Sequence, residues 1–182
     1  DALKQSLELA QAADELGVNG AYFRVHHFAP QAASPMPLLG AIAGSTTHIE
    51  VGTGVIDMRY ENPLYLAEEA AALDQISDGR VALGVSRGSP EPAKDGWRVF
   101  GYDAQEANGS DMARVKFELF LSAIRGEGVA EADTLENQYP QMYQPGTTLP
   151  IFPHSPGLDR RIWRVSGTNA TAVQAAKDGV NL

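Results

Sequence analysis

Apolar and polar residues follow two different periods along this chain. Short apolar runs of strand length are separated by longer stretches in which apolar residues recur every three to four positions, as they do in helices. The runs predict strands at residues 21–25, 49–56, 80–85 and 161–166. This strand–loop–helix repeat is typical of a β/α barrel, with parallel strands inside and helices outside.

Five helices are predicted around the strands. The first ends near Gly17, and its apolar face consists of Leu3, Leu7, Ala10, Ala13 and Leu16. The third follows Asn62-Pro63, a capping residue with proline at the first helical position. The other three are predicted at residues 38–47, 111–124 and 168–178.

Two long segments lack a regular period. Residues 86–109 form a polar loop, and a loop of that length is usually functional or mobile. Residues 127–160 contain five prolines and are predicted to be irregular. On the third helix, Asp74 is expected to be solvated or paired with a cation, away from the strand ends.

Composition limits the classes of function. The chain has 182 residues, enough for a single domain over residues 1–182, and a formal charge of -9 argues against nucleic-acid binding. With no cysteine, it has no disulfide and no cysteine-ligated metal. No apolar run approaches the ~18 residues that span a membrane, and no signal peptide is visible, so a cytoplasmic location is expected. Both ends are abrupt, which suggests a piece of a longer protein.

Candidate chemistry lies where the strands end. His26 and His27 follow the first strand, and an imidazole can donate or accept a proton near neutral pH. A plain hydrogen bond to a loop is the alternative role. A metal site is not expected, because adjacent residues of a strand point to opposite faces and no carboxylate stands at ligand spacing.

Two further strand ends could bind an anion. Arg87 follows Ser86 between two glycines, a setting in which a guanidinium can hold a phosphate. Thr168 and Asn169 begin the last helix, where free N–H groups favour an anion. The alternatives are a surface arginine and simple capping of the helix.

Several motifs, taken in order, resemble the bacterial luciferase-like monooxygenase family. They are His26-His27-Phe28, Val51-Gly52-Thr53-Gly54, Asn62-Pro63, Ser77-Asp78-Gly79-Arg80, Gly84-Val85-Ser86-Arg87-Gly88 and Arg98-Val99-Phe100-Gly101. The resemblance runs over nearly the whole chain and implies flavin-dependent enzymes on a (β/α)₈ TIM barrel. The chain resembles only strand units two to five, so the expected fold is an α/β partial barrel, incomplete at both ends.

The resemblance also implies roles for individual residues. It places His26 beside the flavin as the catalytic residue, and Ser86 near the flavin ring. Arg87 contacts the flavin phosphate, and Thr168 and Asn169 are expected to hold the same group. A non-proline cis peptide beneath the ring corresponds to Gly54-Val55. Many family members have glutamate before the histidine pair, but here Val25 stands there, so any role of that carboxylate is lost.

The implied reaction is monooxygenation, in which reduced FMN and O₂ oxidise a small organic substrate such as an aldehyde. A separate flavin reductase is the expected partner, because no dinucleotide fingerprint is present, and the full-length parent is expected to be a dimer. One alternative is a hydride-transfer enzyme that uses the deazaflavin F420. Another is a non-catalytic flavin-binding protein or subunit. The chain alone is expected to be a poor catalyst.

Overall fold

Four parallel strands form the main sheet in a computed structural model that describes residues 1–30, 32–88 and 91–182. In spatial order they are β1 (Gly20–Phe23), β2 (Glu50–Asp57), β3 (Val81–Ser86) and β6 (Ile162–Arg164). Each pairs in parallel with the next. The predicted strands and their parallel direction are confirmed, although individual ends differ by one or two residues.

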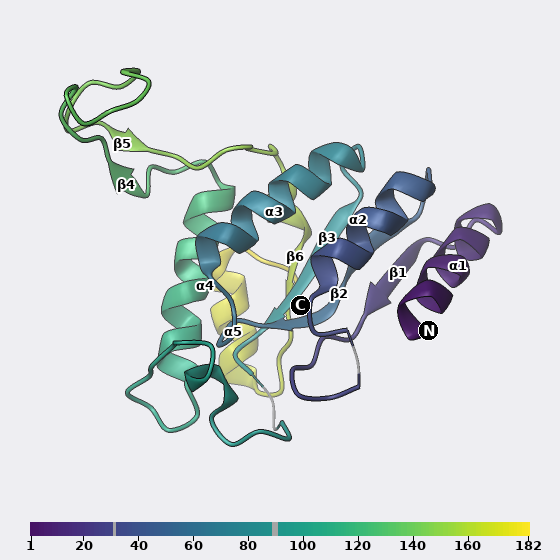
Figure 1. The fold of residues 1–182 in the computed structure, drawn as a ribbon. Helices are drawn as coiled ribbons and strands as arrows, with labels where there is room; N and C mark the ends of the chain where they lie inside the picture. The colour runs from purple at the N-terminus through teal and green to yellow at the C-terminus, as the bar shows by residue number, and fades with distance from the viewer. Residues whose placement is uncertain (31, 89–90) are drawn as a thin grey trace.

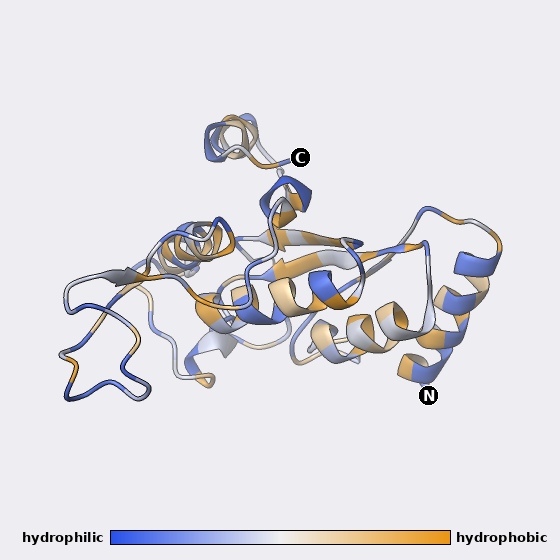
Figure 2. Ribbon diagram, turned by 90° about the horizontal axis from the view of Figure 1, so that it is seen from above, coloured by the Kyte–Doolittle hydropathy of each residue, from blue (hydrophilic) through white to orange (hydrophobic). Residues whose placement is uncertain are grey.

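Five α-helices lie in an arc on the outer side of this sheet (Figures 1 and 2). They are α1 (Ala2–Glu15), α2 (Pro35–Ser45), α3 (Pro63–Ile76), α4 (Ser110–Ile124) and α5 (Asn169–Asp178). From α1 to α4, each helix packs against the next. The predicted start of α2 at residue 38 was wrong by three residues, because proline is tolerated in the first turn and Pro35 begins the helix.

The two faces of the sheet differ in what they carry. The outer face packs on the helices and carries the buried residues Val51, Leu83 and Ile162. The inner face carries the partly exposed aromatic side chains of Tyr22 and Trp163, which pair in register with Gly52 and Gly84. Gly52 is required there, because a Cβ at this position would lie 1.9 Å from the carbonyl oxygen of Ala82.

The two long segments contain short elements that the sequence pattern missed. The first includes the 3₁₀ helix η1 (Gly96–Arg98). The second includes an antiparallel pair, β4 (Ala130–Glu131) with β5 (Thr148–Leu149), on an arm that projects from the body (Figure 1). A further 3₁₀ helix, η2 (Leu158–Arg161), leads into β6. Strands of two residues are too short to show an alternating pattern.

At the amino ends of the strands, a buried carboxylate joins three segments. The Asp74 side chain on α3 is 1% exposed and receives two hydrogen bonds from Arg161, at 2.7 Å from Nη1 and 2.8 Å from Nη2. It also accepts hydrogen bonds from Ser155 Oγ at 2.6 Å and from Val81 N at 3.2 Å. Pairing of Asp74 is thus confirmed, and the alternative of a solvated side chain was wrong.

A second cation closes the same end of the sheet. Arg80 donates hydrogen bonds to the backbone carbonyls of Ala43 at 2.9 Å, Thr46 at 3.1 Å and Ile49 at 2.8 Å. These carbonyls belong to the end of α2 and the segment that leads into β2. Arg80 therefore satisfies backbone acceptors that the helix leaves unpaired and fixes α2 against β3.

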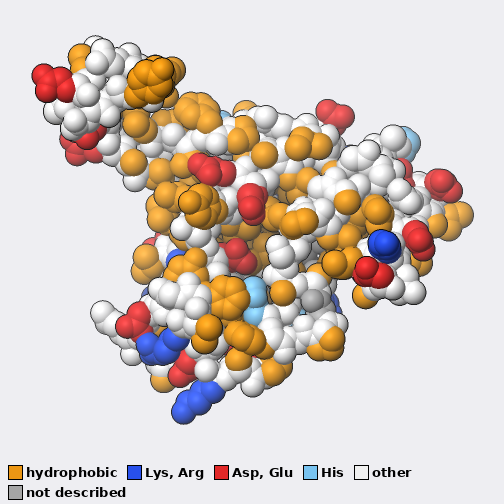
Figure 3. Space-filling model, in the orientation of Figure 1, with side chains coloured by type: hydrophobic (Ala, Val, Ile, Leu, Met, Phe, Trp, Pro, Cys, Tyr) orange, Lys and Arg blue, Asp and Glu red, His pale blue; other side chains and the backbone are white. Residues whose placement is uncertain are grey.

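The face in Figure 3 shows separate Lys and Arg side chains among hydrophobic and acidic ones, rather than a continuous basic surface. Among the helices of the described residues, none is both long and apolar enough to cross a membrane.

We predict that Asp74→Asn lowers the free energy of unfolding by about 3 kcal/mol, because it leaves the Arg161 charge without its buried partner. Urea-induced unfolding measures the change. The matched control is Glu69→Gln, the same carboxylate-to-amide change at an exposed position of the same helix, which should alter stability by no more than about 0.5 kcal/mol. Equal effects of the two substitutions would contradict the role given to the ion pair.

Candidate active site

A cavity of about 380 Å³ opens at the carboxyl ends of the strands, where barrel enzymes place their chemistry. This volume lies within the range of ~300–1,000 Å³ that is usual for small-molecule sites. Six of the seven residues predicted for the site line the cavity: His26, Gly54, Val55, Ser86, Arg87 and Thr168. Asn169 does not; it is exposed at the start of α5, beside a neighbouring surface depression.

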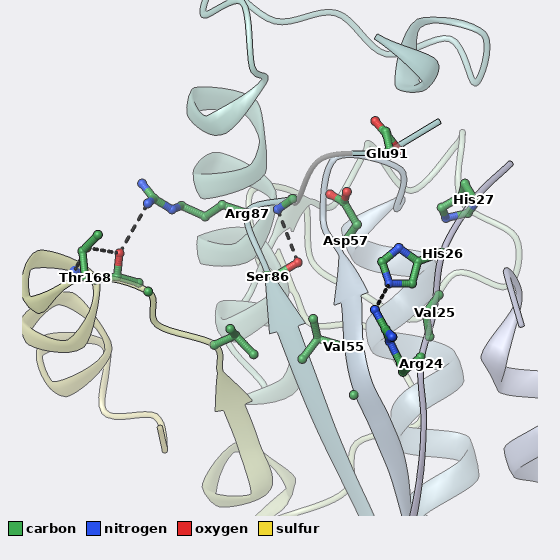
Figure 4. Close-up of a pocket in the computed structure, with 15 residues that line it drawn as sticks. Arg24, Val25, His26, His27, Val55, Asp57, Ser86, Arg87, Glu91 and Thr168 are labelled. Atoms are coloured by element: carbon green, nitrogen blue, oxygen red, sulfur yellow. Dashed lines mark hydrogen bonds between the residues drawn. The ribbon is translucent and has the colours of Figure 1, made fainter. Parts of the chain in front are cut away.

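One end of the cavity is cationic and rich in hydroxyl groups. The Arg87 side chain extends from the end of β3 toward α5 and donates a hydrogen bond to Thr171 Oγ1 at 3.3 Å (Figure 4). Thr168 Oγ1 caps α5 by accepting from Thr171 N at 3.2 Å. The first N–H groups of a helix have no partner within the helix, so this end of the cavity suits an anion.

Glycines keep part of the cavity wall open. A Cβ built on Gly54 would meet nothing nearer than 3.9 Å, and one on Gly167 nothing within 4 Å, so both positions face free space. The Gly54-Val55 peptide is cis, as the resemblance implied. The hydroxyl of Ser86 is engaged locally, since it donates to the carbonyl of Ile56 at 3.2 Å and accepts from Gly88 N at 3.3 Å.

The neighbour of His26 is an arginine rather than a carboxylate. Arg24 Nη2 lies 3.2 Å from His26 Nε2, and a guanidinium has only donors, so Nε2 must accept (Figure 4). In this contact the neutral ring carries its proton on Nδ1. Val25, in the position where glutamate was expected from the resemblance, is buried in the hydrophobic core.

His27 lies in a different environment from His26. Its ring stacks on Tyr60 with centroids 4.0 Å apart, and Phe100 meets it edge-on at 5.2 Å. Burial lowers the pKa of His27, which favours the neutral imidazole. Both histidines line the cavity, because the pair follows β1 in a turn rather than lying within the strand, so the opposite-face argument does not apply to it.

An ionic cluster beside the histidines was not predicted from the sequence. Asp57, at the end of β2, accepts hydrogen bonds from Arg59, at 3.0 Å and 3.1 Å from Nε and at 2.6 Å from Nη2. Arg59 Nη2 also lies 3.3 Å from Glu91 Oε1, while Tyr60 donates its hydroxyl hydrogen to Glu91 Oε2. The one feature of the sequence that could have indicated this cluster is the position of Asp57, directly after the predicted strand 49–56.

The aromatic residues of the long loop mainly pack. Trp97 is buried beneath the Arg59 guanidinium, 4.6 Å from the ring centroid. Lys116 lies 3.1 Å above the ring of Tyr102. Within the described ranges, no group of three or more His, Cys, Asp or Glu side chains is placed to hold a metal ion.

Comparison with known proteins agrees with this geometry. The family model for luciferase-like monooxygenases matches residues 1–182. The oxygenase component of the flavin-dependent trigonelline monooxygenase of Acinetobacter baylyi is 33% identical over 102 residues, which are 51% of this chain and 28% of that protein. The chain spans about half the length of the curated relatives that it matches throughout.

Solved structures show the same fold. The monooxygenase RslO1 from Streptomyces bottropensis superposes with a TM-score of 0.74 and 25% identity, over 99% of this chain and 53% of that one. The coenzyme F420 dependent tetrahydromethanopterin reductase from Methanopyrus kandleri gives a TM-score of 0.67 at 22% identity, over 96% and 50% of the two chains. Since the family model matches the chain from its first residue to its last, this chain belongs to the luciferase-like monooxygenase family.

Proposed function

We propose that this chain supplies the cofactor site of a flavin-dependent monooxygenase, in which reduced FMN and O₂ oxidise a small organic substrate. The observation that carries the proposal is the meeting of Arg87 with the start of α5 in the same cavity as His26. An anion-binding end and a proton-carrying histidine in one cavity fit a phosphorylated redox cofactor. The family relationship makes a flavin the cofactor of choice.

The residues of the cavity fit FMN. Arg87, Thr168 and Thr171 would hold the phosphate through charge and hydroxyl groups. Gly54 and Val55 would support the flat ring, because their side of the cavity is open. Ser86 would fix the backbone between the phosphate end of the cavity and the ring end, through its hydrogen bonds to Ile56 and Gly88. Asn169 would at most add a backbone N–H at the helix start, since its side chain lies outside the cavity lining.

When bound, reduced FMN supplies the electrons with which O₂ is activated. His26 would contribute a proton donor at Nδ1, because Arg24 occupies its Nε2. His27, stacked and neutral, would exclude water from the wall rather than carry charge.

The partners follow from the same assignment. We propose a separate flavin reductase, in line with the name of the relative from A. baylyi, which is an oxygenase component. The substrate is a small organic molecule. A dimeric assembly and a cytoplasmic location stay predictions.

A deazaflavin enzyme is the second candidate, and the likeness of fold to the F420-dependent reductase favours it. The deciding experiment uses a protein that contains this chain. It is supplied with either reduced FMN and isotopically labelled O₂ or reduced F420. Oxygen label in the product supports monooxygenation. Oxidation of F420 without oxygen incorporation would replace the monooxygenase proposal with the deazaflavin enzyme. Flavin binding without either reaction would indicate a non-catalytic flavin-binding protein.

We predict that Arg87→Ala weakens FMN binding about tenfold or more but leaves riboflavin binding nearly unchanged. A charge-assisted hydrogen bond contributes about 1.5–3 kcal/mol, and riboflavin lacks the phosphate that would receive it. Quenching of flavin fluorescence measures both affinities. Arg114→Ala, at an exposed arginine of α4 outside the cavity lining, is the control. Equal losses for the two flavins would remove Arg87 from the phosphate role.

We also predict that Arg24→Met shifts the tautomer equilibrium of His26 away from the Nδ1–H form by about 2- to 10-fold. This range corresponds to the loss of one hydrogen bond of about 0.5–1.5 kcal/mol. Nitrogen-15 NMR of the imidazole rings reports the tautomer directly, without any need for activity. Arg24→Lys keeps a donor and should retain more of the Nδ1–H form. A wild-type ring protonated mainly at Nε2 would contradict the assignment.

A further inference from the structure

The end of the cavity away from Arg87 holds a carboxylate with unused hydrogen-bonding capacity. The side chain of Glu91 is only 9% exposed and lines the cavity (Figure 4). Its Oε2 accepts the hydrogen bond from Tyr60. Its Oε1 lies near Arg59 but has no hydrogen-bond partner in the described part of the chain.

Charge in this cluster is not balanced. The Arg59 guanidinium faces two carboxylates, and both oxygens of Asp57 take its hydrogen bonds at 2.6–3.1 Å. Glu91 receives only the longer ion-pair contact of 3.3 Å. Among these three side chains one cation faces two anions, and Glu91 is the carboxylate less neutralised by Arg59. The next cation, Lys116, interacts with the carboxylates of Glu61 and Asp57.

A second buried polar atom faces the same cavity. His27 Nε2 also lacks a hydrogen-bond partner among the described residues, and its ring lines the cavity. A buried polar group without a partner costs about 1–3 kcal/mol, so two such atoms beside a cavity favour a ligand that bonds to them. The stacked rings of His27 and Tyr60 add a flat apolar wall suited to an organic body.

We propose that Glu91 and His27 recognise a positively charged, N–H-bearing group of the organic substrate, such as an ammonium or a protonated nitrogen heterocycle. Its role as a substrate site rests on the proposed function. A cation is favoured over a neutral donor because the cluster carries the excess negative charge, and a charge-assisted bond is roughly twice as strong as a neutral one. The two ends of the cavity would then bind opposite charges: the Arg87 end binds an anion and the Glu91 end binds a cation.

The test uses three small probes of similar size: benzylammonium, benzyl alcohol and phenylacetate. Calorimetry on a wild-type protein that contains this chain should show benzylammonium binding about tenfold or more tighter than benzyl alcohol, with phenylacetate weakest. Glu91→Gln keeps the shape and an acceptor for Tyr60, and it should remove the preference for benzylammonium while leaving benzyl alcohol unaffected. Glu69→Gln, an exposed carboxylate of α3, should leave the preference intact.

Absence of the preference in the wild type, or a preference that survives Glu91→Gln, would overturn the inference. If Glu91→Gln fails to fold, the ranking of the three probes on the wild type still decides. FMN affinity, measured in the same samples, separates the two proposals. FMN binding without cation selectivity overturns this inference alone, and cation selectivity without FMN binding overturns the flavin assignment alone.

Discussion

The ion pair between the buried carboxylate of Asp74 and the partly exposed Arg161 is the contact that anchors the last strand of the sheet, β6. Strand β6 has three residues and pairs in three positions with β3, which is little to hold a strand in place. Arg161 directly precedes it and is fixed to α3 by two hydrogen bonds. Helix α5 follows β6 closely, so this pair helps to fix the position of Thr171 opposite Arg87 at the cationic end of the cavity.

The two ends of the strands therefore have different tasks. At the amino ends, hydrogen bonds of Asp74 and Arg80 join helices to the strands and to the segments beside them. At the carboxyl ends, the side chains that line the cavity include those of Arg87, His26 and Glu91. The segment Ser77–Arg80, one of the strongest points of resemblance to the family, lies at the stabilising end. A likeness in sequence there supports the fold more directly than it supports the chemistry.

Local pattern was enough to predict the strands, their parallel direction and the capped start of α3, because strand runs, the helices between them and a helix cap are all set by residues close in sequence. Residues that end a strand could be named as site candidates for the same reason, and six of the seven lie together. The pairing of Asp74 with Arg161 was out of reach, since 87 positions separate them. Glu91 lies in the long loop, where no period shows which side chain turns inward. The arm that carries β4 and β5 has no regular alternation of apolar and polar residues from which its strands could be predicted.

Arg24 contacts His26 from outside the hydrophobic core. Its side chain is exposed, so replacing it removes little buried surface and disturbs the framework little. The hydrogen-bond partner of His26 Nε2 is thus a residue that can change without first compensating for lost stability. Proteins built on this sheet can therefore change the surroundings of this histidine by single substitutions, while the scaffold they inherit stays the same.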